Sequence, residues 1–316
     1  MNAQLRSRTR TLAPVTVRAP GKINVHLGVG GLDDHGYHEL ATVFQALNLS
    51  ETLTLIPGGS GQIVVRGRYA DAGVPQDESN FARKAISVMI RALEGRREVE
   101  VLRDLDIIID KQVPVAGGMG GGSADAAAAL VGAAHLLGGV EESILHDCAV
   151  AVGADVAFLL HGGTAIGLGR GEKLSPVLTR GSFHWVLATS AGQLSTPTIY
   201  SRFDELNPAP APAVIPDQVL TALAAGDPEA LATAAANDLT EAAVSAMPEL
   251  AEVMEAGRAA GALLPLLSGS GPTIGFLARD AHHALDLAVL LQATRGVKEA
   301  IRTTGPAPGA HVVHEP

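Results

Sequence analysis

The chain has 316 residues, 47% of them hydrophobic, and a formal net charge of −10. This length suits two packed domains, and so apolar a composition excludes a disordered chain. The acidic charge disfavours nucleic acid and anionic membranes as partners, and no apolar run approaches the ~20 residues of a membrane helix. The single cysteine, Cys148, forms no internal disulfide, so we expect a cytoplasmic protein.

The first 180 residues are predicted to form strands and helices. They begin with an N-terminal segment, residues 1–12, that we expect to be disordered. Apolar runs between turn signals predict the strands, and helical spacing after a cap at Ser79 or Asn80 predicts the first helix. The expected strands are 16–18, 22–28, 42–47, 52–56, 63–66 and 105–110, with a glycine-rich strand and turn over 162–171. The expected helices are 80–93, 123–137 and 141–152.

A second set of elements follows His184. The pattern predicts strands over 185–189, 272–278 and 311–313 and helices over 198–206, 217–225, 228–236, 239–261 and 281–294. A proline- and alanine-rich linker occupies 207–216. We place the domain boundary near Arg180, which predicts domains over 1–180 and 181–316.

The segment from Pro114 to Ala124 has five glycines in six positions, after an expected strand and before an expected helix. A helix start offers unpaired N–H groups and a positive dipole end, so such a loop suits a phosphate. The alternative is a flexible surface loop. The loop lacks the Gly-Lys-Ser/Thr ending of a Walker A motif, and the sixth place counted from Gly118 is Ser123, not the glycine of a dinucleotide fingerprint.

Several polar residues outside this loop are candidates for chemistry. Lys22, Asn24 and His26 share one strand face, which suits either an anionic ligand or a solvated edge. Asp155 lies among apolar residues and is either a general base, a partner for Lys22 or a helix cap.

A turn and a second loop add further candidates. Tyr37, on a polar turn, suits stacking against a flat ring, whereas a histidine such as His38 is more often a surface residue. The glycine- and serine-containing loop 268–273 suggests a ligand approached from both domains. The histidines form no metal-binding pattern, and a nucleophilic triad lacks support.

Three segments together resemble the ordered motifs of the GHMP small-molecule kinases, and they span nearly the whole chain: Pro20–Asn24, Pro114–Ala124 and Ser268–Pro272. Segments 36–40, 153–156 and 195–200 are similar to the branch that phosphorylates the 2-hydroxyl of a cytidyl diphosphate ester of methylerythritol, in non-mevalonate isoprenoid biosynthesis. The resemblance implies an α+β fold. It consists of a ribosomal protein S5-like N-terminal domain and an α/β-plait-like C-terminal domain, with the active site in the cleft between them.

The resemblance also implies roles. Asp155 would take the hydroxyl proton beside Lys22, and Asn24 would help to position the substrate. Tyr37 and Tyr200 would stack on the two faces of cytosine, and His38 would contact the polar edge of the base. Thr196 would lie beside this pocket. Further substrate contacts would come from Gly269, Ser270 and Gly271. The implied ATP-binding residues are Pro114, Val115, Ala116, Gly117, Gly118, Met119, Gly120, Gly121, Gly122, Ser123 and Ala124, with Ser123 also near Mg²⁺.

The expected cofactors are therefore ATP and Mg²⁺, and the expected partner is a small-molecule substrate, with neither nucleic acid nor membrane. We expect a monomer or weak homodimer. Two alternatives stay open: a homoserine or mevalonate kinase-like enzyme, which would lack the Gly-Tyr-His turn, and a non-catalytic nucleotide-binding module on the same scaffold, which loss of Lys22 or Asp155 would have indicated. A nucleic-acid-binding protein is disfavoured by the acidic charge.

Overall fold

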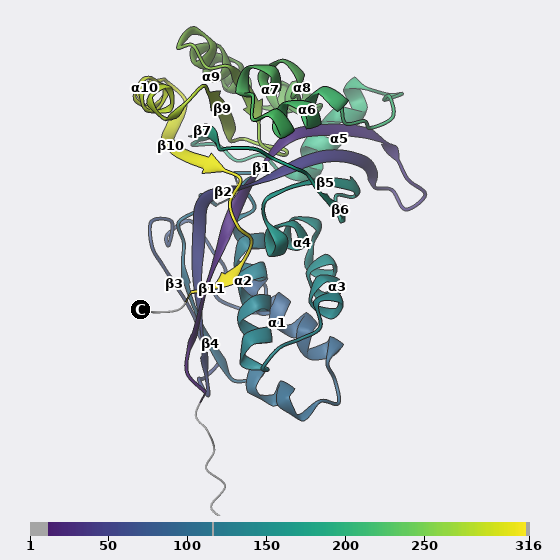
Figure 1. Ribbon diagram of the computed structural model, residues 1–316, viewed down its shortest axis with the longest axis vertical. Coiled ribbons are helices and arrows are strands. Elements are labelled where there is room, and N and C mark those ends of the chain that lie inside the picture. Colours follow the sequence, from purple (N-terminus) through teal and green to yellow (C-terminus); the bar gives the residue numbers. More distant parts are fainter. Residues whose placement is uncertain (1–11, 116, 314–316) are drawn as a thin grey trace, which may run out of the picture.

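The computed structural model describes residues 12–115 and 117–313 (Figure 1). The expected disordered lead, apart from Leu12, and Ala116 of the glycine loop lie outside the described residues. The fold is a mixture of helices and two sheets, so the α+β prediction is confirmed. No helix in the described part of the chain combines the length and apolar character that a bilayer crossing requires.

The larger sheet has seven strands in the order β11-β1-β2-β4-β3, with β5 also beside β2 and β6 beside β5. Only the β3–β4 pair is parallel among these. Its strands are β1 (Val15–Leu32), β2 (His38–Pro57), β3 (Ile63–Arg66), β4 (Leu105–Asp110), β5 (Thr164–Gly169), β6 (Lys173–Pro176) and β11 (His311–Val312). The helices of this half are α1 (Phe81–Ala92), α2 (Gly121–Leu136), α3 (Glu142–Val152) and α4 (Ala154–His161), with a 3₁₀ helix over Arg97–Leu102.

The smaller sheet is antiparallel, with strand order β10-β7-β9-β8. Its strands are β7 (Phe183–Ser190), β8 (Leu264–Leu267), β9 (Ile274–Ala278) and β10 (Val297–Gly305). The helices of this half are α5 (Thr196–Leu206), α6 (Asp217–Ala225), α7 (Pro228–Ala234), α8 (Thr240–Ala246), α9 (Glu249–Ala259) and α10 (Ala281–Gln292). Figure 1 shows α1 to α4 beside the larger sheet and α5 to α10 at the opposite end of the molecule.

The long β1–β2 hairpin connects the two halves (Figure 1). The two strands expected over 16–18 and 22–28 form one continuous strand, β1. β-Bulges at Pro20/Gly21 and Asn24/His26 shift its register against β2 without ending the strand. Ile23 and Val25 from β1 share an apolar cluster with Trp185 and Leu187 from β7. The Trp185 indole N–H donates to the Gln45 side-chain oxygen at 3.1 Å, so this buried donor at the junction has a partner.

The α2 helix packs closely because its buried positions are mostly alanine and glycine. A Cβ on Gly132 would lie 2.9 Å from a terminal methyl group of Leu55, so the helix lies close to β2 and a larger residue there would require the Leu55 side chain to move. Ahead of it, Asn80 caps α1 by accepting from the Ala82 N–H at 2.9 Å, which confirms that cap.

One expectation about the second half is wrong, and two of its strands were not expected. The helix expected over 239–261 is two helices, since Pro248 disfavours helical backbone at Met247, which has φ −140° and ψ 84°. The short strand β8 was not expected. β10 was not expected either, because it is an edge strand with a partly polar sequence and so lacks the apolar run that predicts a strand. The last strand, β11, pairs with β1 in the larger sheet. The domain boundary near Arg180 stays a prediction.

Candidate active site

Lys22 and Asp155 lie side by side. The Lys22 Nζ, on β1, is 3.5 Å from Oδ2 of Asp155, in the first turn of α4. Lys22 is 4% exposed, so the alternative of a solvated strand edge is wrong. The Asp155 side chain is 34% exposed and can meet a ligand. Gly153 is the N-cap of α4, so the capping interpretation of Asp155 is wrong as well.

A chain of hydrogen bonds orients the Lys22 ammonium. Its Nζ donates to Asn24 Oδ1 at 2.7 Å, and the Asn24 amide donates to Thr42 Oγ1 at 2.9 Å. The Thr42 hydroxyl in turn donates to the His26 carbonyl at 2.7 Å. An ammonium has three N–H donors. Within the described part of the chain Nζ makes one hydrogen bond, to Asn24, and an ion pair with Asp155 at 3.5 Å, so N–H donors remain for an anionic ligand.

His26 is a structural residue. Burial lowers the pKa of its imidazole, which favours the neutral ring. One ring nitrogen lies 3.0 Å from the Val214 carbonyl oxygen, and the other accepts from the Ala236 N–H at 3.4 Å. The first nitrogen must therefore carry the proton and donate it. The ring attaches β1 to the second half of the chain.

The glycine loop lies directly against β1 and against the second loop. The Lys22 N–H donates to the Met119 carbonyl at 2.9 Å, and the Ser268 hydroxyl donates to the Gly118 carbonyl at 3.0 Å. Gly118 has φ +75°, and a Cβ there would lie 2.1 Å from the Ser268 carbonyl oxygen. This close approach between the loops requires glycine.

The glycine loop lines a cavity of about 400 Å³ at the start of α2. Gly120, in the left-handed conformation, is the N-cap of α2, so the first N–H groups of the helix are available to an anion. Met119 and Ala124 are buried among apolar residues instead. The loop residues that line the cavity are Pro114, Val115, Gly117, Gly118, Gly120, Gly121, Gly122 and Ser123.

The far wall of this cavity holds residues that the sequence analysis missed. Gly73, Val74, Pro75, Asn80 and Phe81 line it. Phe81 is 44% exposed although it is large and apolar, and it lies near enough to Gly122 that a Cβ there would be 3.2 Å from the ring. The sequence did offer one signal for this wall: a phenylalanine directly after a helix cap, at a position where the helix faces solvent.

A buried ionic cluster lies beneath the glycine loop, and two of its members, Lys111 and Asp125, line the same cavity. The Lys111 Nζ lies 2.7 Å from Glu51 Oε1 and 2.6 Å from Asp125 Oδ2, and all three side chains are almost fully buried. Burial raises the pKa of Asp125 to about 7, an effect that Lys111 opposes and Glu51 adds to. Burial likewise raises the pKa of Glu51. A Cβ on Gly121 would touch both Glu51 and Lys111, so the cluster lies directly beneath the glycine loop.

The second loop covers Lys22. A Cβ on Gly269 would lie 3.4 Å from both Lys22 Nζ and Asn24 Oδ1. The Asn237 amide, another residue that the sequence analysis missed, donates to the Leu267 and Gly269 carbonyls at 2.8 Å each. The Ser270 hydroxyl is 2.8 Å from that of Thr196. Gly271, with φ +80°, packs instead against Leu267 and Leu194.

The structure brings Tyr37, His38, Thr196 and Tyr200 together around a second cavity of about 490 Å³. The His38 ring stacks on Tyr200, with centroids 5.0 Å apart and an interplanar angle of 27°. His38 Nδ1 donates to the Gly30 carbonyl at 2.9 Å, and Nε2 lies 3.3 Å from Asp204 Oδ1. The His38 side chain is only 7% exposed, so the expectation of a surface histidine is wrong.

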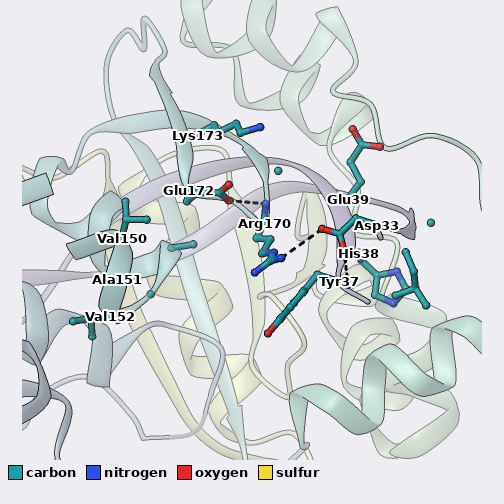
Figure 2. Close-up of a pocket in the computed structure, with 15 residues that line it drawn as sticks. Asp33, Tyr37, His38, Glu39, Val150, Ala151, Val152, Arg170, Glu172 and Lys173 are labelled. Atoms are coloured by element: carbon teal, nitrogen blue, oxygen red, sulfur yellow. Dashed lines mark hydrogen bonds and ion pairs between the residues drawn. The ribbon is translucent and has the colours of Figure 1, made fainter. Parts of the chain in front are cut away.

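Two observations connect the aromatic cavity to the Lys22–Asp155 pair and the glycine loop. Thr196 lines both the 400 Å³ and the 490 Å³ cavities. Burial raises the pKa of Tyr200 to about 12, and the negative charge of Asp155 adds to this shift. Figure 2 shows Tyr37 and His38 from the side of a third, larger cavity of about 940 Å³.

Comparisons with known proteins agree with this geometry. Residues 80–163 match the model of the GHMP kinases N terminal domain, and residues 219–291 match that of the GHMP kinases C terminal domain. A 4-diphosphocytidyl-2-C-methyl-D-erythritol kinase of Nocardia farcinica is 49% identical over 305 residues, which cover 95% of this chain and 97% of that protein. The enzyme of the same name from Mycobacterium tuberculosis is 46% identical, covering 96% and 94%. The chain belongs to the family of 4-diphosphocytidyl-2-C-methyl-D-erythritol kinases.

Solved structures agree with this family. A crystal structure of 4-(cytidine 5′-diphospho)-2C-methyl-D-erythritol kinase superposes with a TM-score of 0.75 at 30% identity, covering 92% of this chain and 98% of that one. A homoserine kinase from Cytophaga hutchinsonii superposes at 0.70 with only 18% identity, over 99% of this chain and 100% of its own, and so shares the fold alone. The chain is thus a small-molecule kinase with the GHMP kinase fold. The homoserine or mevalonate kinase-like alternative and the non-catalytic module are not favoured.

Proposed function

We propose that this kinase transfers the γ-phosphoryl group of ATP to the 2-hydroxyl of 4-diphosphocytidyl-2-C-methyl-D-erythritol, a step in isoprenoid precursor biosynthesis. The observation that carries this proposal is the position of Lys22 and Asp155. They lie next to a glycine-lined cavity at a helix start and near an aromatic cavity, and Thr196 lines both cavities. An anion-binding loop and a stacking site on either side of a carboxylate suit phosphoryl transfer to a nucleotide-linked alcohol.

The substrate assignment is tested by supplying purified protein and ATP with the cytidyl substrate, homoserine or mevalonate in parallel. We expect phosphorylation of the cytidyl substrate alone, because neither of the other two has a base to stack between Tyr37 and Tyr200. ADP formation measured at several acceptor concentrations separates turnover from background ATP hydrolysis. Comparable turnover of homoserine or mevalonate would contradict the proposal.

Asp155 is the proposed general base for the acceptor hydroxyl. Phosphoryl transfer depends on positioning and charge stabilisation more than on covalent help from the protein. Lys22, fixed by Asn24 at 2.7 Å, holds the Asp155 carboxylate in place and presents its charge to the phosphate groups. Asn24 is thereby a positioning residue.

The glycine loop is the proposed ATP phosphate site. The left-handed Gly118 and Gly120 let the loop pack closely against Ser268 and Lys22, and the α2 N-terminus offers N–H donors to phosphate oxygens. The Ser123 hydroxyl lines the same cavity and fits Mg²⁺, which usually keeps several waters and takes few protein ligands beside substrate phosphates. When bound there, Mg²⁺ would neutralise phosphate charge. The exposed Phe81 ring is the proposed surface for adenine.

The aromatic cavity is the proposed cytosine site. Tyr37 and Tyr200 provide the flat surfaces, His38 contacts the polar edge of the base, and Thr196 lies beside it. Gly269, Ser270 and Gly271 belong to the loop over Lys22 and are proposed to contact the acceptor. Gly271 has no side chain, so it can contact the acceptor only through its backbone.

Replacing Tyr200 with alanine should raise the KM for the cytidyl substrate by about 10-fold, since stacking of a base on an aromatic ring contributes about 1–3 kcal/mol. The KM for ATP should stay within about twofold. Steady-state kinetics with each substrate varied in turn measures both constants. Phe203→Leu, which also alters a ring beside His38 but does not line the aromatic cavity, is a matched control for local packing. An unchanged KM for the cytidyl substrate in Tyr200→Ala would contradict the stacking role.

We further propose a cytoplasmic location, as a monomer or weak homodimer, without nucleic acid or membrane as partners. The acidic net charge of −10 supports the last point.

A further inference from the structure

Arg170 covers one face of the Tyr37 ring. Its Cζ lies 3.5 Å from the ring centroid, which is van der Waals contact between the flat guanidinium and the aromatic face. Figure 2 shows the guanidinium and the His38 imidazole on opposite sides of the Tyr37 ring. The face of Tyr37 toward His38 is therefore not the face that Arg170 occupies.

Tyr37 itself has little other support. It is 53% exposed, at the end of the β1–β2 hairpin, and it lines both the 490 Å³ and the 940 Å³ cavities. A tyrosine side chain in such a position loses conformational freedom when a ligand stacks on it, and that loss weakens binding. A contact that holds the ring beforehand removes this cost.

The local backbone fixes Arg170 in place. It stands at the tip of the turn between β5 and β6, between Gly169 at φ +73° and Gly171 at φ +96°. Its backbone N–H donates to Glu172 Oε2 at 2.6 Å, and its Nη2 lies 3.6 Å from Asp33 Oδ2. Figure 2 shows both interactions as dashed lines.

Asp33 connects Arg170 to the turn that carries Tyr37. The Asp33 Oδ1 accepts from the backbone N–H groups of Tyr37 and His35 at 2.9 Å each. The hydrogen bond from Tyr37 is the main cause that lowers the pKa of Asp33, with the Arg170 charge adding to it. One carboxylate thus holds the backbone of Tyr37 while its other oxygen faces the guanidinium that covers the ring.

We propose that Arg170 is a positioning residue that holds the Tyr37 ring from the side of the larger cavity, so that its opposite face is ready to stack on the nucleobase. This role rests on the proposed function, because it assumes a pyrimidine between Tyr37 and Tyr200. It predicts a dependence on the planar guanidinium rather than on positive charge alone.

The kinetic test uses Arg170→Ala, Arg170→Lys, Tyr37→Ala and the Arg170→Ala/Tyr37→Ala double variant. Arg170→Ala should raise the KM for the cytidyl substrate roughly two- to fivefold, with kcat and the KM for ATP unchanged. Arg170→Lys should resemble Arg170→Ala. In the Tyr37→Ala background, removal of Arg170 should have no further effect. Arg258→Ala, which removes an exposed and ion-paired arginine on α9, is the matched control.

Two kinetic results would overturn the proposal. A full effect of Arg170→Ala in the Tyr37→Ala background would mean that Arg170 contacts the substrate directly. Wild-type behaviour of Arg170→Lys would mean that charge alone matters.

Tyrosine ring resonances provide a readout that needs no turnover. The chain has three tyrosines, Tyr37, Tyr69 and Tyr200, so each ring signal of ¹³C-tyrosine-labelled protein can be assigned by substitution. Arg170→Ala should shift the Tyr37 signal and leave that of Tyr69 in place. An unmoved Tyr37 signal would overturn the proposal. A wild-type protein that cannot phosphorylate the cytidyl substrate would overturn the proposed function instead, and the spectra would still decide whether Arg170 holds the ring.

Discussion

Asp155→Asn should lower kcat by about 10²–10⁴-fold, the range that a single general base typically contributes. The amide keeps the size of the side chain but cannot take the acceptor proton. The change leaves the buried Lys22 ammonium with its hydrogen bond to Asn24 but without its carboxylate partner, so we also expect a lower midpoint of thermal unfolding. Steady-state phosphorylation and thermal denaturation of the same preparation measure the two effects separately.

Asp217→Asn is a matched control, since Asp217 is also a carboxylate in the first turn of a helix, α6, and it lines neither the glycine-loop cavity nor the aromatic cavity. It should retain wild-type turnover. Lys22→Met should reduce kcat as Asp155→Asn does, because it removes the cation that holds the Asp155 carboxylate. A kcat of Asp155→Asn within tenfold of the wild-type value would show that Asp155 is not the general base.

Lys111→Met should lower the free energy of unfolding by about 3–5 kcal/mol, the usual cost of removing one partner from a buried ion pair. Glu51 and Asp125 would be left buried without the ammonium that lies 2.7 and 2.6 Å away. Urea denaturation at pH 8 measures the change. Lys298→Met, at an exposed lysine on β10, is the control for loss of a surface charge.

The loss in Lys111→Met should shrink as the pH falls from 8 to 5. Burial already raises the pKa of Asp125 to about 7, and Lys111 opposes this shift. Removing Lys111 therefore raises the pKa of both carboxyls further. A carboxyl whose folded pKa exceeds its unfolded value, 3.8 for Asp125, stabilises the folded state at low pH and loses that effect as the pH rises through the folded pKa. A loss that is independent of pH would contradict this account of the cluster.

The segments with strong local signals were predicted well. The strands at 63–66 and 105–110 and the helix at 217–225 have the bounds expected from their apolar spacing and flanking turn residues. The division of residues 239–261 into α8 and α9 depends on one proline, whose effect on the preceding residue competes with the helical pattern on both sides. β10 has no such pattern, because its position at a sheet edge leaves it partly solvated.

The buried cluster shows why part of the site could not be predicted. Glu51 and Lys111 meet because β2 and β4 pair with Thr52 opposite Asp110, and Asp125 joins them from α2. Nothing within 51, 111 or 125 alone distinguishes these residues from surface charges. Their ion pairs exist only once the strand register is established.

The sequence by itself determined the α+β class, the glycine loop between a strand and a helix, and the family, because these depend on local backbone preferences and on ordered motifs. Only the tertiary structure decided that Lys22 is buried and 3.5 Å from Asp155, that His38 stacks on Tyr200, and that Arg170 covers Tyr37. Each of these contacts joins residues far apart in the chain. Their distances follow from strand register and helix packing, which no local pattern encodes.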